Sequence, residues 1–134
     1  MRAIAALAVF AALAVPARAS DGSLRWTLQA GVATTNTYKR ERLEPRLLIT
    51  LAALRADRPS TPPGRDGRLL AIDGFNAALR AVRAELEFYN EDRGSLAEAT
   101  KDASRADRNW KLAAHLLRQA GNALGVRIGT VNGR

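Results

Sequence analysis

The chain has 134 residues, which is enough for one small domain. Its 47% apolar and 25% charged residues are typical of a globular protein and exclude an intrinsically disordered one. The absence of cysteine excludes disulfides and thiolate metal sites, and 21 basic against 13 acidic residues give a net charge of +8, which favours anionic partners.

Residues 1–19 have the pattern of a secretory signal peptide. Arg2 comes first, an apolar run over residues 3–15 follows, and small residues precede Ser20. The apolar run is shorter than the ~20 residues of a membrane-spanning helix, although an uncleaved anchor is the alternative. We therefore expect cleavage after Ala19, a mature chain with 19 basic and 13 acidic residues (+6), and a periplasmic or secreted location.

Residues 20–43 form an N-terminal segment whose structure the sequence leaves open. Within residues 23–33, apolar residues alternate with polar ones as in a strand, at Leu24, Trp26, Leu28, Ala30 and Val32. Ser23, followed by leucines one helical turn apart, equally predicts a short helix with a serine cap. Residues 23–33 are therefore predicted to be either a strand or a short helix.

A helix is predicted over residues 44–56, with Pro45 in its first turn, where proline is well tolerated. Its leucines fall on one side, at Leu47, Leu48, Leu51 and Leu54. Residues 57–67 follow with three prolines and two glycines, which predicts a linker without regular structure.

Two longer helices are predicted from apolar residues that recur every three or four positions. The first helix spans residues 68–91, and its stripe consists of Ile72, Phe75, Leu79, Val82, Leu86 and Tyr89. The second spans residues 95–124, and its stripe consists of Leu96, Ala99, Ala103, Ala106, Trp110, Ala113, Leu117, Ala120 and Leu124. Residues 125–134 are predicted to be a loose basic tail.

Two arrangements of these helices are open. In the first, Gly94 turns the chain, and Ser95 and Glu98 form a capping box, so that the helices pack as an antiparallel hairpin. In the second, one helix runs through residues 68–124, because apolar residues stay seven apart across the supposed turn, and the chain forms a coiled-coil oligomer. We favour the first, an all-α helical domain over residues 44–124 in which the 44–56 helix packs on the hairpin.

The acidic residues before and after this turn are the one candidate for a catalytic site. Glu87 and Glu91 lie one helical turn apart, so a glycosidase-like carboxylate pair is conceivable there. Both lie off the apolar stripe, however, and a solvated carboxylate lacks the burial that raises its pKa for acid catalysis. With His115 as the single histidine and no cysteine, no metal site is expected. The sequence has no phosphate-binding glycine loop or serine nucleophile elbow, so no cofactor is expected.

Two surfaces of the 95–124 helix are candidate binding sites. Basic side chains on one stripe of this helix would bind anions, namely Lys101, Arg105, Arg108 and His115. Leu112 and Leu116 lie away from the apolar stripe and, together with Trp110, make this helix apolar nearly all round. Either the 44–56 helix or a partner protein is expected to cover them.

These features predict a non-enzymatic, exported helical binding or adaptor protein of the bacterial cell envelope. It would engage a partner protein or an anionic envelope component, namely a lipid headgroup, lipopolysaccharide or a wall polymer. Export makes nucleic acid an unlikely partner. The alternatives are a structural homo-oligomer built on a continuous 68–124 helix and an envelope hydrolase that uses Glu87 and Glu91.

Overall fold

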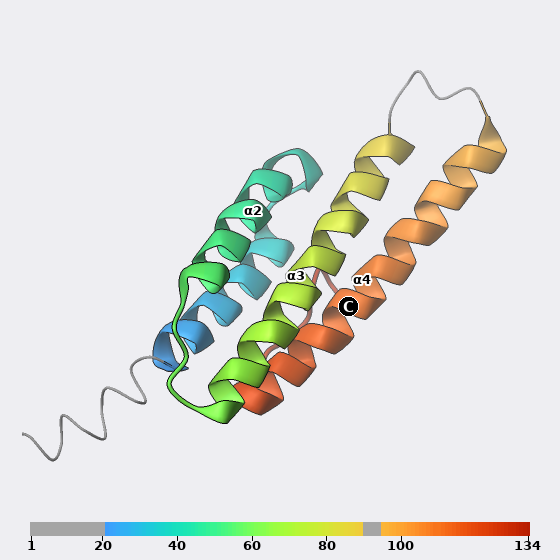
Figure 1. Ribbon diagram of the computed structural model, residues 1–134. Coiled ribbons are helices and arrows are strands. Elements are labelled where there is room, and N and C mark those ends of the chain that lie inside the picture. Colours follow the sequence, from blue (N-terminus) through green and yellow to red (C-terminus); the bar gives the residue numbers. More distant parts are fainter. Residues whose placement is uncertain (1–20, 90–94) are drawn as a thin grey trace, which may run out of the picture.

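The computed structural model describes residues 21–89 and 95–134, and all the regular secondary structure in these residues is helical. An N-terminal helix over residues 21–37 precedes α2 (Arg40–Ala56), α3 (Pro62–Phe88) and α4 (Leu96–Leu124). Figure 1 shows the N-terminal helix and α2 as one pair beside the pair formed by α3 and α4. Because α3 contacts both α2 and α4, it lies at the centre of the fold. The predicted all-α class is confirmed.

The segment over residues 23–33 belongs to a helix, so the strand alternative is wrong. Leu24, Leu28 and Val32 are buried on one face of this helix. The alternation that resembles a strand arises because Trp26 and Ala30 are apolar residues on the opposite face. An apolar residue on the outer face of a helix therefore produced the false period of two.

Helix α2 begins four residues before the predicted start, at Arg40, and Pro45 lies inside it. The reason is Leu43, which is buried one turn before Leu47 and extends the apolar face of the helix. Leu48, predicted to lie on that face, is exposed.

The predicted linker over residues 57–67 is too long by six residues, because α3 begins at Pro62. The side chain of Thr61 caps the helix and accepts a hydrogen bond from the Gly64 N–H at 3.0 Å. Proline in the first turn lacks an N–H that would otherwise have no helical partner, so it starts this helix instead of preventing it. Further along α3, Arg68 donates to the carbonyls of Leu54 and Arg55 and fixes the end of α2.

Helices α3 and α4 are separate and pack side by side, so the continuous helix over 68–124 is not formed (Figure 1). Helix α4 starts where predicted, since the Ser95 hydroxyl accepts a hydrogen bond from the Glu98 N–H at 3.1 Å. It ends at Gly125, whose φ of +71° suits glycine. The predicted turn at Gly94, like Glu91, lies outside the described residues.

The contact between α3 and α4 is made by small residues of α3. A Cβ added at Gly67 would lie 2.5 Å from Leu124 Cγ, and one added at Gly74 would lie 2.6 Å from Leu117 Cδ2. We call the face of α3 that carries these glycines the glycine seam (Gly67, Ala71, Gly74 and Ala78). The predicted apolar stripe of α3 has a different direction, because the ring of its Phe75 reaches Gly31 of the N-terminal helix.

Both predicted stripes are buried over only part of their length. Phe75, Leu79 and Val82 are buried, whereas Tyr89 at the end of α3 is 58% exposed. On α4 the stripe is buried from Ala106 onward, but Leu96 is 84% exposed. The apolar pattern continues to the ends of both helices, but at these ends no other described element covers it. The predicted core positions of Tyr89, Leu96 and Ala103 are therefore wrong.

The C-terminal segment over residues 125–134 is anchored, which corrects the prediction of a loose tail. Val131 is fully buried. The main-chain N–H of Asn132 donates to Thr35 Oγ1 at 3.0 Å, and Asn36 Nδ2 donates to the Thr130 carbonyl at 2.7 Å. This segment therefore joins the N-terminal helix to α4. The 44–56 helix packs on the hairpin through α3 and does not contact α4, so the expected cover over Leu112 is not formed.

None of the helices in the described part of the chain combines the length and the hydropathy that a membrane span requires.

The glycine seam gives a stability prediction. Gly74→Ala is expected to lower the free energy of unfolding by about 1–3 kcal/mol, because the new methyl group would overlap Leu117. Urea unfolding followed by circular dichroism measures the change. Gly22→Ala is the matched control, since the nearest atom to its Cβ is 3.8 Å away, and it should be neutral or stabilise by up to ~1 kcal/mol. Equal stability of both variants would contradict the close contact.

Candidate functional site

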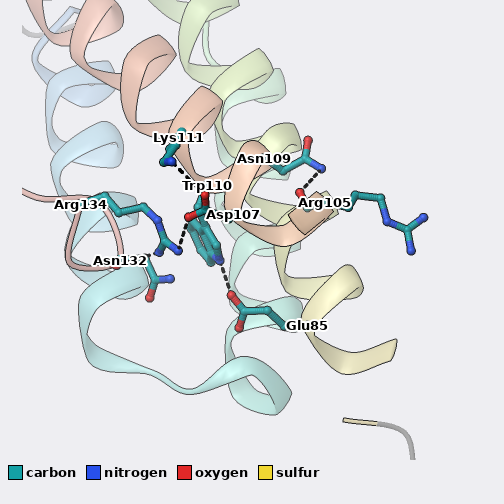
Figure 2. Close-up of polar contacts among 8 residues, drawn as sticks. All are labelled: Glu85, Arg105, Asp107, Asn109, Trp110, Lys111, Asn132 and Arg134. Carbon is teal, nitrogen blue, oxygen red and sulfur yellow. Dashed lines mark hydrogen bonds and ion pairs between the residues drawn. The ribbon is translucent and has the colours of Figure 1, made fainter. Parts of the chain in front are cut away.

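The most concentrated group of polar side chains lies where α3, α4 and the C-terminal segment meet (Figure 2). We call it the C-terminal cluster, and it consists of Glu85, Asp107, Trp110, Asn132 and Arg134. Trp110 is 1% exposed, and its indole N–H donates to the Glu85 carboxylate. The Arg134 guanidinium lies 5.9 Å from the centroid of the Trp110 ring. The cluster thus satisfies the one polar group of the largest buried side chain.

Asp107 is the electrostatic centre of this cluster. Lys111 Nζ lies 2.9 Å from one of its carboxylate oxygens and Arg134 Nη2 lies 3.2 Å from the other, and Figure 2 shows both cations directed toward it. The hydrogen bond from Lys111, followed by the one from Arg134, lowers the pKa of Asp107 below its usual value. Asp107 therefore stays ionised and holds Arg134 in place, which is an anchoring role and not that of an acid catalyst.

A hollow of about 420 Å³ adjoins the cluster, and its wall includes Arg40 and Tyr89. The Arg40 guanidinium lies 3.7 Å from the centroid of the Tyr89 ring, which is a cation–π contact. Two guanidinium groups, of Arg40 and Arg134, face the hollow together with the carboxylates of Glu85 and Asp107. Opposite charges balance within it, so the hollow does not select for ligands of either sign.

Only one member of the predicted pair of catalytic carboxylates, Glu87, lies in the described residues. Glu87 is exposed at the surface, where one of its oxygens lies 2.9 Å from Arg105 Nη2. Its proposed partner, Glu91, lies outside the described residues. Within residues 21–89 and 95–134, no group of three or more histidine, aspartate and glutamate side chains could hold a metal ion.

The four basic residues predicted to share one stripe of α4 do not all have a free charge. Arg105 bonds Glu87 at 2.9 Å and also pairs with the buried Asp102, so its charge is neutralised. Lys101, Arg108 and His115 are exposed, and none of the ion pairs or side-chain hydrogen bonds of the described residues involves them. Successive members are seven residues apart, which is about 10 Å along a helix. We call these three residues the basic ridge.

Of the three residues in the predicted partner surface, only Leu112 and Leu116 reach the surface of the protein. Trp110 is buried within the chain itself and therefore does not belong to an exposed surface. Leu112 is exposed, and Leu116 is half-buried. Leu112 lies between Arg108 and His115 along the helix and about 40–60° to one side of them, so one exposed apolar side chain borders the basic ridge.

The sequence analysis missed an apolar surface on the opposite helices. Trp26 on the N-terminal helix and Ile49 on α2 are 72% and 69% exposed. They line one groove of about 210 Å³ together with Ala30 and Ala53. The helical reading of residues 23–33 contained the signal, because Trp26 lies two residues from both Leu24 and Leu28 and so faces away from them.

Comparison of the chain with models of protein families, with curated proteins and with solved structures found no match.

The anchoring role of Asp107 predicts a pH effect. Because its folded-state pKa is lowered, ionised Asp107 contributes stability above about pH 4 that is lost as the pH falls through the folded-state pKa. Asp107→Asn should remove this part of the acid sensitivity, measured as the urea midpoint at a series of pH values in low salt. Asp73→Asn is the control, since Asp73 is exposed and in none of the described ion pairs. Identical pH profiles for both variants would contradict this role.

Proposed function

We propose that the protein is an exported, non-enzymatic binding protein of the bacterial cell envelope. It engages an anionic envelope component or an acidic partner protein through the outer face of α4. The observation that supports this proposal is the basic ridge, in which Lys101, Arg108 and His115 project from a helix whose inner face is fixed in the core. Exposed cations that make no ion pair within residues 21–89 and 95–134 favour an external anion.

The electrostatics of the rest of α4 support the same surface. Asp107 is neutralised by Lys111 and Arg134, and Asp102 is paired with Arg105. The carboxylates of Asp102 and Asp107 therefore contribute little negative field on the side of the ridge, whereas Glu98 in the first turn of α4 is exposed and weakens the positive field near Lys101. Leu112 adds apolar contact area between two of the cations. A ligand that combines negative charge with apolar groups would satisfy both features.

The non-enzymatic part of the proposal draws on the known environment of the acids. A catalytic carboxylate pair needs two groups held across a cleft in different environments. Glu87 is exposed and ion-paired, Glu85 is bonded to a core tryptophan, and Asp107 is held ionised by two cations. Each of these carboxylates thus has a structural role.

The ridge predicts a charge-dependent interaction. The double variant Lys101→Gln/Arg108→Gln should bind the soluble polyanion dextran sulfate about tenfold more weakly at low salt. Its affinity should also depend less steeply on salt concentration, measured by fluorescence anisotropy of the labelled polymer. Arg55→Gln/Arg65→Gln is the matched control, since both arginines are exposed on other helices. The same loss in both double variants would show attraction by net charge and contradict a specific ridge.

The export part of the proposal depends on residues 1–19, which lie outside the described residues. The first described residue, Asp21, is buried and bonded to Thr61 at 2.6 Å, so a cleavage after Ala19 would leave the domain's first contact intact. Mass spectrometry of the protein from the envelope fraction is expected to find an N-terminus at Ser20. An intact Met1 in the mature protein would contradict cleavage.

A further inference from the structure

The outer face of the helix pair formed by the N-terminal helix and α2 carries two large apolar side chains that nothing in the described chain covers. Trp26 and Ile49 are 72% and 69% exposed and line a shared groove with Ala30 and Ala53. Most exposed apolar residues are scattered singly, whereas neighbouring large ones on a rim of polar groups mark an interaction surface. We call this surface, with the arginines described next, the Trp26 face.

Cations occupy the same face, and two of the three acids of the two helices, Asp21 and Glu44, are engaged elsewhere. Arg46 lines the groove and Arg42 precedes Ile49 by seven residues, so both share its side of α2. Among the acids, Asp21 is buried against Thr61. Glu44 bonds Arg83 of α3 at 2.9 Å.

The remaining acid, Glu41, lines a hollow together with Arg42 near the start of α2, about 12 Å along the helix from Ile49. With two arginines and one glutamate, this end of the Trp26 face keeps a net positive charge, and the other end is apolar. The Arg46 guanidinium is also fixed in position, because it lies 3.7 Å from the centroid of the Tyr38 ring.

We propose that the Trp26 face lies on an anionic lipid surface. Trp26 and Ile49 would enter the boundary between headgroups and acyl chains, and Arg42 and Arg46 would contact lipid phosphates. A tryptophan ring with one polar N–H suits this boundary, and arginine stems cover apolar surface while their charged ends reach phosphate. An apolar stripe beside cations is the arrangement by which helices bind in the plane of a membrane interface.

Charge favours an anionic lipid surface over a second copy of the chain as the partner of the Trp26 face. A symmetric dimer through the Trp26 face would bring Arg42 and Arg46 of both copies into one interface, where Glu41 beside Arg42 offers only one carboxylate for the two arginines of each copy. Shape argues against a small-molecule ligand enclosed in the groove. Trp26 protrudes, and the hollow beside it, about 210 Å³, is smaller than the ~300 Å³ at which enclosed ligand pockets begin. A soft lipid surface can adapt to such a protrusion.

This inference is independent of the basic ridge, because the Trp26 face lies on the N-terminal helix and α2, and α3 separates α2 from α4 (Figure 1). The ridge test uses a soluble polyanion and variants of α4. Failure of either proposal is therefore distinguishable from failure of the other.

The two tryptophans make the test direct. Trp110 is buried, so acrylamide quenching of the full chain reports mainly on Trp26. Vesicles of phosphatidylglycerol and phosphatidylcholine in equal amounts are expected to shift the emission to shorter wavelength and to protect it from acrylamide. Vesicles of phosphatidylcholine alone should do neither. Trp26→Phe should abolish the shift, since only Trp110 then remains.

Variants of the Trp26 face test the apolar and the charged contributions to vesicle binding separately. Ile49→Ser and Arg46→Gln should each weaken partitioning onto the anionic vesicles by about tenfold, measured by vesicle co-sedimentation. The matched controls are Leu69→Ser, an apolar side chain of α3 that is 57% exposed, and Arg65→Gln, and both should partition like the parent. All four side chains are exposed, so we expect urea unfolding to show that the four variants are folded.

Three outcomes would overturn the proposal. The first is an absence of partitioning onto anionic vesicles, and the second is partitioning that Ile49→Ser leaves unchanged. The third is a shift of the emission that occurs without lipid and rises with protein concentration, together with a dimer mass in light scattering. That result would assign the Trp26 face to a second copy of the chain.

Discussion

The close contact between α3 and α4 along the glycine seam determines where the other elements can lie. Gly67 and Gly74 leave no space for a Cβ, because the leucines of α4 occupy it. Glu85 continues the same face of α3 and meets Trp110. The larger apolar side chains of α3 lie on the adjacent face, about 50–110° further round the helix. Phase places Phe75, Leu79 and Val82 there, and Phe75 meets a third glycine, Gly31, on the N-terminal helix.

This arrangement leaves one side of α4 for the C-terminal segment. Burying Val131 contributes ~1.5–3 kcal/mol, while ordering the backbone costs ~1–2 kcal/mol for each residue. A single side chain therefore cannot hold the segment over residues 126–134. Val126 and Ile128, which are partly buried against the core, add apolar contacts. Hydrogen bonds to Thr35 and Asn36 and the ion pair with Asp107 add polar ones. The segment consequently depends on both helix pairs, and an acid-sensitive group lies at its end.

The sequence predicted the fold best where local chemistry decides it. Ser95 and Gly125 bound α4 within one residue of the prediction, because a cap and a left-handed glycine act within one turn. The start of α3 was missed because the prolines were read without Thr61, the cap that precedes them. The glycine seam was missed because glycine and alanine barely register in a hydrophobic pattern. Burial at Tyr89 and Leu96 depends on distant neighbours, which periodicity does not contain.

Burial distinguishes the side chains that the fold requires from those that it does not require. The chain has two tryptophans, and only one serves the fold: Trp110 is enclosed and its N–H is bonded to Glu85. Trp26 faces away from the core, and a polar residue there would leave every described core contact intact. Lys101 and Arg108 are equally dispensable for packing. Residues that depart from the needs of folding are where function is expected. In this protein they lie on surfaces of two different helix pairs, so one molecule could contact a lipid surface and a second anionic ligand at once.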